Sequence, residues 1–297
     1  MASPEQLTIS DGVVAATVTP GLGAGLSRFD YVARGAVEPV FKPGPPERGP
    51  LDPAMFLLLP FSNRISGGGF TFRGGFHRLE PNVPGEPYPI HGDGFSQPWR
   101  LVEADATAGR LRLESAGGAF SYAAHVRYAV GGGALTAELT IGNRGADAMP
   151  FGLGFHPWLM RTSDVVLQAP ATGVWRETED HLRAADAPVA VPPEWDFTEA
   201  KSLPPGFINN GFSGWAGEAA VVWPQRQLRL DIRASDKLST YIVYSPSATA
   251  DYFCFEPVSH PVDAHHLPSS VANGLVVLEP GETTSARVTF AVSRSPG

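Results

Sequence analysis

The sequence predicts an all-β protein in which many short strands are joined by turns. Apolar and polar residues alternate with a period of two along much of the chain, which is typical of strands with one buried face. The 33 glycines and 29 prolines follow no regular period and make up about a fifth of the 297 residues. Both residue types weaken helix interiors, and no helix-period segment of ten or more residues is apparent. Charged residues reach only 18%, against 43% hydrophobic residues, which excludes a disordered chain.

The clearest element is a hairpin in the middle of the chain. In residues 120–130, apolar side chains occupy every second position, with His125 and Arg127 between them. Three glycines at 131–133 interrupt the alternation, which resumes in residues 135–141. Glycine adopts the positive φ angles that tight hairpin turns require, so 131–133 is predicted as the turn.

Shorter alternating segments predict further strands, and two segments rich in Pro and Gly predict loops. A final hairpin is expected to join two of these strands, 275–278 and 287–292, through the turn 279–282. The strand pattern is alike on both sides of each loop, so residues 1–297 are predicted to form one domain. No repeat of 20–50 residues is present, which argues against a propeller with regular blades. The other predicted strands are 110–114, 227–233 and 240–244, and the loops are 41–53 and 184–205.

Charge and hydropathy predict a soluble, cytoplasmic protein that binds neither nucleic acid nor membrane. The net charge of −8 and pI near 5.5 leave no basic patch for phosphates. The longest apolar stretch, 54–61, is too short to span a bilayer, and the first ten residues lack the pattern of a signal peptide. The single cysteine, Cys254, cannot form an internal disulfide.

Four segments combine polar residues with apolar, Gly or Pro neighbours: 61–66, 89–95, 152–158 and 253–260. They contain Arg64, His91, His156 and Glu256 among residues that are expected to be buried. Buried charges need a partner or serve a site. Each residue also has an ordinary explanation, because arginines form structural ion pairs and histidines form hydrogen bonds in loops.

The order of these motifs resembles the aldose 1-epimerase (galactose mutarotase-like) family. The segment NRISGGGFTFRGGFHRLEPNVPGEPYPIHGDGFSQPWRL at 63–101 is similar to the family's Asn-Arg to His-Gly region. Gly-Leu-Gly-Phe-His-Pro-Trp at 152–158 is similar to its second-histidine motif. Cys-Phe-Glu-Pro at 254–257, followed by Pro-Val-Asp, resembles its catalytic-glutamate motif. The resemblance extends from about residue 10 to 292.

The resemblance implies a large antiparallel β-sandwich of the galactose mutarotase type, with a groove for a monosaccharide. Such enzymes act in carbohydrate metabolism and interconvert α and β anomers without a metal or organic cofactor. We expect a monomer or homodimer. By resemblance, Glu256 is the general base at the C1 hydroxyl and His156 is the general acid at the ring oxygen.

Further positions carry over to substrate binding. By resemblance, Arg64 and His91 hold sugar hydroxyls, with Asn63 beside them. Trp158 is a candidate apolar face for the sugar, as are Phe95 and Trp99, although all three aromatics are equally suited to core packing.

One position departs from the family pattern. The family has an aspartate in a short Asp-x-x-Phe motif that binds sugar hydroxyls, and Asn209 occupies the matching position here. Asparagine forms hydrogen bonds as donor and acceptor but carries no charge. The change bears on the preferred sugar more than on the reaction.

The residue types suit mutarotation independently of the resemblance. The reaction removes a proton at O1 and delivers one at O5, which a carboxylate and an imidazole can do, each contributing roughly 10²–10⁴-fold. A glycoside hydrolase that uses Glu256 and Asp93 is an alternative, but it leaves the histidines unexplained. A carbohydrate-binding protein without activity is another, but it has no need for both His156 and Glu256.

Two further alternatives involve other ligands. A hexose-6-phosphate 1-epimerase would need positive charge for the phosphate, which the arginines at 73, 78 and 161 could supply. A divalent metal site could form in the segment 260–266, which contains His260, Asp263, His265 and His266, but its spacing matches no zinc motif.

Overall fold

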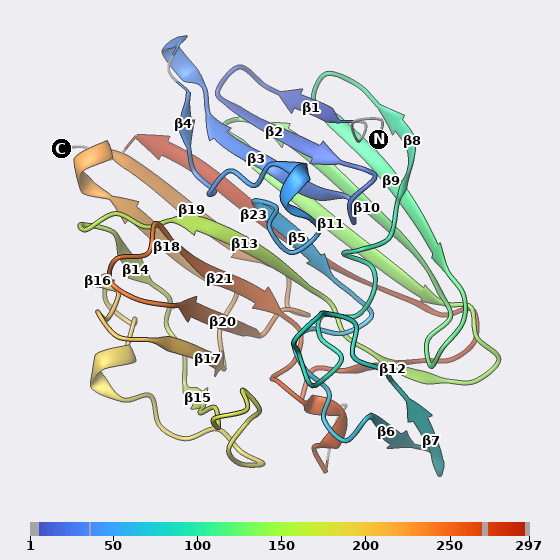
Figure 1. Cartoon of the computed structure of the whole chain (residues 1–297). Helices are drawn as coiled ribbons and strands as arrows, with labels where there is room; N and C mark the ends of the chain where they lie inside the picture. The colour runs from blue at the N-terminus through green and yellow to red at the C-terminus, as the bar shows by residue number, and fades with distance from the viewer. Residues whose placement is uncertain (1–5, 36, 269–272, 295–297) are drawn as a thin grey trace.

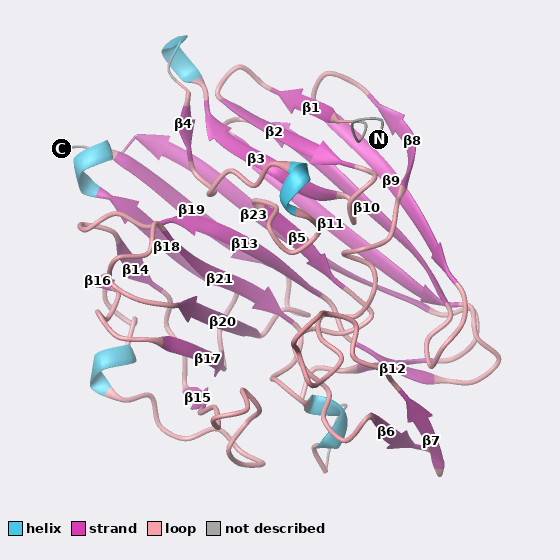
Figure 2. Cartoon of the chain, in the orientation of Figure 1, coloured by secondary structure: helices cyan, strands magenta, loops and turns pink. Residues whose placement is uncertain are grey.

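The computed structural model describes residues 6–35, 37–268 and 273–294 (Figure 1). These residues form 23 strands, and the only helices among them are five 3₁₀ turns of three residues each (Figure 2). The prediction of an all-β fold is therefore confirmed. The described residues include no helix that is long and apolar enough to cross a membrane. The 3₁₀ turns are η1 (Ala33–Gly35), η2 (Pro46–Arg48), η3 (Pro193–Trp195), η4 (Pro224–Arg226) and η5 (Ala264–His266).

The first large sheet has ten strands, and its centre carries the candidate site. Its order is β1-β2-β3-β5-β13-β21-β20-β17-β15, with β4 paired to β3. All of its ladder pairs are antiparallel. The strands are β1 (Leu7–Ser10), β2 (Val14–Thr19), β3 (Gly25–Tyr31), β4 (Glu38–Pro39), β5 (Met55–Leu58), β13 (Gly154–Met160), β15 (Gly173–Trp175), β17 (Ile208–Ser213), β20 (Thr240–Ser245) and β21 (Tyr252–Val258).

The second large sheet has nine strands in the order β16-β14-β18-β19-β23-β11-β10-β9-β8. It contains the predicted central hairpin, in which Gly131 of β10 pairs with Ala134 of β11 and the two turn glycines have positive φ. The strands are β8 (Arg100–Ala104), β9 (Ala108–Ser115), β10 (Tyr122–Gly131), β11 (Ala134–Asn143), β14 (Val166–Gln168), β16 (Lys201–Ser202), β18 (Glu218–Trp223), β19 (Leu228–Ala234) and β23 (Thr283–Arg294).

The predicted final hairpin is wrong. Strand β22 (Val276–Leu278) pairs with β12 (Met149–Phe151) in a separate two-stranded sheet. Strand β23 pairs with β11 along one edge and β19 along the other, so it has no free edge for β22. The remaining small sheet joins β6 (Gly69–Phe72) to β7 (Gly75–Arg78).

The inner faces of the two large sheets share one hydrophobic core. On β13, Phe155 and Leu159 are fully buried in this core, together with Leu139 of β11 and Phe290 of β23. The period of two therefore turns the intervening residues of β13 to the opposite face of the first sheet. The same alternation holds on β21, where Phe253 and Phe255 belong to the core.

Candidate active site

All seven predicted site residues line one cavity on the outer face of the first sheet. The cavity has a volume of about 420 Å³. Central strands of this sheet and the loop after β5 contribute its walls, so segments far apart in the sequence meet there (Figure 1). The seven residues are Asn63, Arg64, His91, His156, Trp158, Asn209 and Glu256. Their roles remain predictions.

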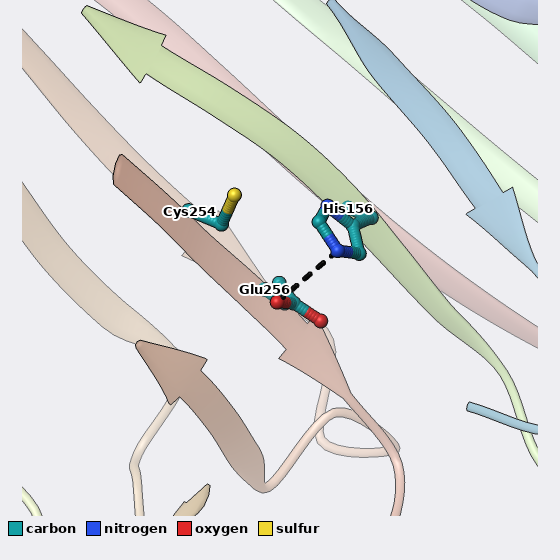
Figure 3. Close-up of side chains that lie close together, drawn as sticks. All are labelled: His156, Cys254 and Glu256. Carbon is teal, nitrogen blue, oxygen red and sulfur yellow. Dashed lines mark ion pairs between the residues drawn. The ribbon is translucent and has the colours of Figure 1, made fainter. Parts of the chain in front are cut away.

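His156 and Glu256 face each other across neighbouring strands. The pairing of Gly154 with Val258 and of Trp158 with Cys254 brings them together at the middle of the β13–β21 ladder. His156 Nε2 lies 3.3 Å from Glu256 Oε1 (Figure 3). Both residues are buried, and each keeps a polar atom without a protein partner in the described structure, Nδ1 and Oε2 respectively.

Burial sets the protonation of this pair. Desolvation raises the pKa of Glu256 to about 8, and Arg64 opposes this rise only in part. Desolvation lowers the pKa of His156 to about 3. Between these two values the pair carries one proton, and burial favours its location on Glu256. The pair thus offers one proton donor and one acceptor, as mutarotation requires, although the expected roles place the proton on His156.

The backbone holds His91 in a fixed orientation and tautomer. Its φ of 61° lies in the left-handed region, and its Nδ1 accepts a hydrogen bond of 3.1 Å from the Asn63 backbone N–H. This bond leaves the proton of neutral His91 on Nε2. Burial, followed by the charges of His156 and Arg64, lowers the pKa of His91 well below its usual value. His91 is therefore a neutral hydrogen-bond donor at the cavity wall.

The backbone conformation at position 92 requires a glycine directly after His91. Its φ is 70°, and a Cβ there would lie 2.0 Å from the Leu59 carbonyl oxygen. Only glycine permits both the conformation and this close approach. The turn that orients His91 therefore depends on Gly92.

Arg64 is paired with Glu86, a residue that the sequence analysis did not predict. Arg64 Nε and Nη2 donate hydrogen bonds of 2.9 and 2.8 Å to the two Glu86 carboxylate oxygens. Glu86 also lines the cavity and neutralises the guanidinium. Arg64 Nη1 lies 3.4 Å from Asn63 Oδ1. The remaining N–H groups of Arg64 can donate hydrogen bonds to a ligand, while Glu86 compensates the positive charge of the guanidinium.

Asn209 lines the cavity with a carboxylate next to it. Its Nδ2 donates a hydrogen bond of 3.0 Å to Glu177 Oε2, which also lies 2.8 Å from His181 Nδ1. The Glu177 backbone N–H donates to Asn210 Oδ1, so the segment is tied to β17. The bond from Nδ2 leaves the Asn209 carbonyl oxygen to accept a hydrogen bond from a ligand.

Aromatic side chains form one end of the cavity. Trp158 stacks on Tyr252 with ring centroids 4.5 Å apart, and Lys42 Nζ lies 4.3 Å from the Tyr252 ring centroid. Tyr244 and Phe207 also line the cavity. The tyrosines occur within β-strands and carry no motif, so the sequence analysis did not select them.

Three residues that were considered for sugar binding or for glycoside hydrolysis lie outside the cavity wall. Phe95 and Trp99 are buried and are not part of the cavity wall. Asp93 accepts hydrogen bonds from Gln97, Ser115 and Tyr122, and it is not part of the wall either. The Glu256–Asp93 pair of a glycoside hydrolase is therefore not assembled.

The arginines suggested for a phosphate are also outside the cavity. Arg73 pairs with Glu279, and Arg78 pairs with Glu80. Arg161 contacts the Ser245 hydroxyl and donates to the Pro204 carbonyl. In the described structure, none of these contacts brings the three arginines to the cavity, where they could bind a phosphate.

The four residues suggested for a metal do not form a common ligand group among the described residues. His260 accepts from the Ser62 backbone N–H, and His265 contacts the Pro150 carbonyl. His266 pairs with Asp263 at 2.8 Å.

Comparisons with known proteins agree with this architecture. A family model described as aldose 1-epimerase matches residues 5–291. The uncharacterized protein YphB of Escherichia coli K12 is 32% identical over 260 residues, which cover 86% of this chain and 89% of that protein. A solved structure from E. coli K12, provisionally described as an aldose 1-epimerase, has a TM-score of 0.91 at 31% identity and covers 98% of this chain and 99% of its own.

A more distant structure shares the fold alone. Galactose 1-epimerase from Lactobacillus acidophilus NCFM is 18% identical, with a TM-score of 0.77 and coverage of 98% of this chain and 95% of its own. The β-sandwich of the galactose mutarotase type is thereby confirmed. Because the family model spans nearly the whole sequence and relatives exceed 30% identity over most of it, the chain belongs to the aldose 1-epimerase family.

Proposed function

We propose that the protein is an aldose 1-epimerase that interconverts the α and β anomers of an unphosphorylated monosaccharide. The observation that carries the proposal is the buried His156–Glu256 pair, with 3.3 Å between Nε2 and Oε1, at the wall of a cavity of about 420 Å³. Cavities of roughly 300–1,000 Å³ are typical of small-molecule sites.

The pair supplies both proton transfers of the reaction. One member removes the proton from the C1 hydroxyl while the other protonates the ring oxygen O5, and the C1–O5 bond breaks to give the open-chain aldehyde. Rotation about the C1–C2 bond exposes the other face of the carbonyl. Ring closure reverses both transfers, so each group acts once as acid and once as base. Glu256 and His156 can begin in either order because the pair holds one proton, and this route uses protein groups alone.

The other cavity residues orient the sugar. His91 donates from Nε2, the Arg64 guanidinium donates its remaining N–H groups, and Asn209 accepts through its carbonyl oxygen. Asn63 fixes the His91 tautomer through its backbone N–H. Trp158 offers an apolar face for the C–H groups of the ring.

The charges of the cavity favour a neutral substrate over a hexose 6-phosphate. Its wall contains the carboxyl groups of Asp52, Glu86 and Glu256, whereas Arg64 is the sole Lys or Arg among its lining residues in the described structure, and Glu86 neutralises it. A phosphate dianion would therefore meet no free cation on this wall.

Anomer exchange tests the proposal directly. Fresh α-glucose, α-galactose and a hexose 6-phosphate should be followed by polarimetry or NMR in the presence of the protein. Acceleration over buffer is expected with a neutral sugar and not with the phosphate. A protein that binds sugars but never accelerates exchange would instead be a carbohydrate-binding member of the fold.

A further inference from the structure

Cys254 lies beside the catalytic pair, although mutarotation does not use it. Cys254 is two residues before Glu256 on β21, so both side chains project from the same face of the sheet. The Cys254 thiol, the His156 imidazole and the Glu256 carboxyl lie close together on one face of the paired strands β13 and β21 (Figure 3). One ligand atom from each of the three residues lies within 4.8 Å of the other two.

The three donors match the preferences of zinc. Zn²⁺ binds sulfur, imidazole nitrogen and carboxylate oxygen in tetrahedral sites, and catalytic-type sites have three protein ligands with one open position. Bond lengths of about 2.0–2.3 Å separate the donor atoms of such a site by roughly 3.3–3.8 Å. The 3.3 Å between His156 and Glu256 already falls in this range. The Cys254 Sγ atom lies within 4.8 Å of the other two donors, so it needs to move by no more than about 1.5 Å to reach this range.

Further observations favour a ligand at this place. All three residues are buried, and the Glu256 Oε2 atom has no protein partner in the described structure. His156 and Glu256 both reach the cavity, which gives an ion a path from solvent and an open coordination position.

We propose that His156, Cys254 and Glu256 form a binding site for a thiophilic divalent cation, with Zn²⁺ as the probe. Binding releases two protons to solvent, one from the thiol and one from the His156–Glu256 pair, because the thiolate, the carboxylate and the neutral imidazole are the metal ligands. The cation occupies the lone pairs that accept protons during mutarotation. Zinc is thus an inhibitor of the enzyme and not its cofactor; the inhibition, unlike the binding, rests on the proposed function.

Direct binding measurements test the site without reference to activity. Chelator-treated, untagged protein is titrated with Zn²⁺ by calorimetry and with Co²⁺ by absorption spectroscopy, where a sulfur-to-cobalt charge-transfer band reports the thiolate. We expect this band in the wild type and its loss in Cys254→Ala. Zinc affinity should fall at least about tenfold in the variant, which corresponds to roughly 1.4 kcal/mol. Mg²⁺ should not compete, because it prefers oxygen ligands.

Two matched variants complete the design. Cys254→Ser preserves the volume of the side chain, so it separates loss of the ligand from a packing defect. His266→Ala removes a partly exposed imidazole outside the trio and should leave zinc affinity unchanged. The site is refuted if the wild type gives no charge-transfer band, if both Cys254 variants bind zinc like the wild type, or if only His266→Ala weakens binding.

Inhibition of mutarotation by zinc provides a separate test of the inhibitory role. Cys254→Ala should mutarotate at the wild-type rate but need at least about tenfold more zinc for half inhibition. If no sugar is turned over, the proposed function fails while the cobalt band still decides the metal site. If zinc binds the trio and leaves mutarotation unaffected, the inhibitory role is refuted.

Discussion

Replacing Glu256 by glutamine should lower activity and raise stability at alkaline pH. Glutamine is nearly isosteric and keeps hydrogen bonding, but it can neither donate nor accept the proton that the reaction transfers. We expect kcat for anomer exchange to fall at least about 100-fold with binding largely kept, which is about 2.7 kcal/mol of transition-state stabilisation. His156→Asn should act similarly, and the double variant should be scarcely slower than the worse single one, because the two groups act as a unit.

The stability effect follows from the burial of the carboxyl group. The folded-state pKa of Glu256 is raised from 4.5 to about 8, so the folded state favours the protonated form. The resulting stabilisation is fully present below pH 4.5 and is lost as the pH rises through about 8. At 1.36 kcal/mol per pKa unit, ionisation costs the wild type up to about 5 kcal/mol by pH 9. The glutamine variant avoids this cost.

Thermal unfolding at pH 5 and pH 9 measures this difference. The Tm of Glu256→Gln minus that of the wild type should be near zero at pH 5 and clearly positive at pH 9. Glu218→Gln, whose side chain is 77% exposed, should show no such trend. A Glu256→Gln variant that is less stable at both pH values, or that mutarotates at nearly the wild-type rate, would refute the reasoning.

Three further predictions concern the same site. The pH profile of kcat/KM should be bell-shaped, with activity lost above about pH 8 as Glu256 loses its proton and below about pH 3 as His156 gains one; a flat profile across pH 8 would contradict this assignment. Arg64→Ala should raise KM by about tenfold or more with little change in kcat, because it removes charge-assisted hydrogen bonds that position the sugar; a normal KM with a collapsed kcat would count against that role. Dialysis against a chelator should not lower the rate of anomer exchange, and a loss that zinc restores would overturn the cofactor-free route.

Local sequence patterns were sufficient to predict seven of the 23 described strands but not all of their partners. The alternation in residues 120–130 and 135–141 correctly predicted β10 and β11, because a hairpin depends on adjacent residues and a glycine turn. The pairing of β22 with β12 joins segments more than 120 residues apart, and no local pattern encodes it. The same limit applied to Glu86, whose pairing with Arg64 depends on how two loops fold together.

The composition of the site followed from motifs, whereas its electrostatics needed the structure. His156 and Glu256 could be selected because polar residues stood among aromatic ones. Their separation and the preferred position of their shared proton depend on the β13–β21 register and on burial. The contact between Asn209 and Glu177 likewise places a carboxylate near the position where the family has an aspartate.

The alternation along β13 and β21 has a consequence for how such a chain can vary. His156 and Glu256 occupy positions next to Phe155 and Phe255, which are buried in the core between the sheets. Inserting or deleting one residue within either strand would turn the proposed catalytic side chain into the hydrophobic core and a phenylalanine into the cavity. We therefore expect these two strands to tolerate exchanges of residue type on the outer face far better than changes of length, which would exchange the residues of the core and of the cavity.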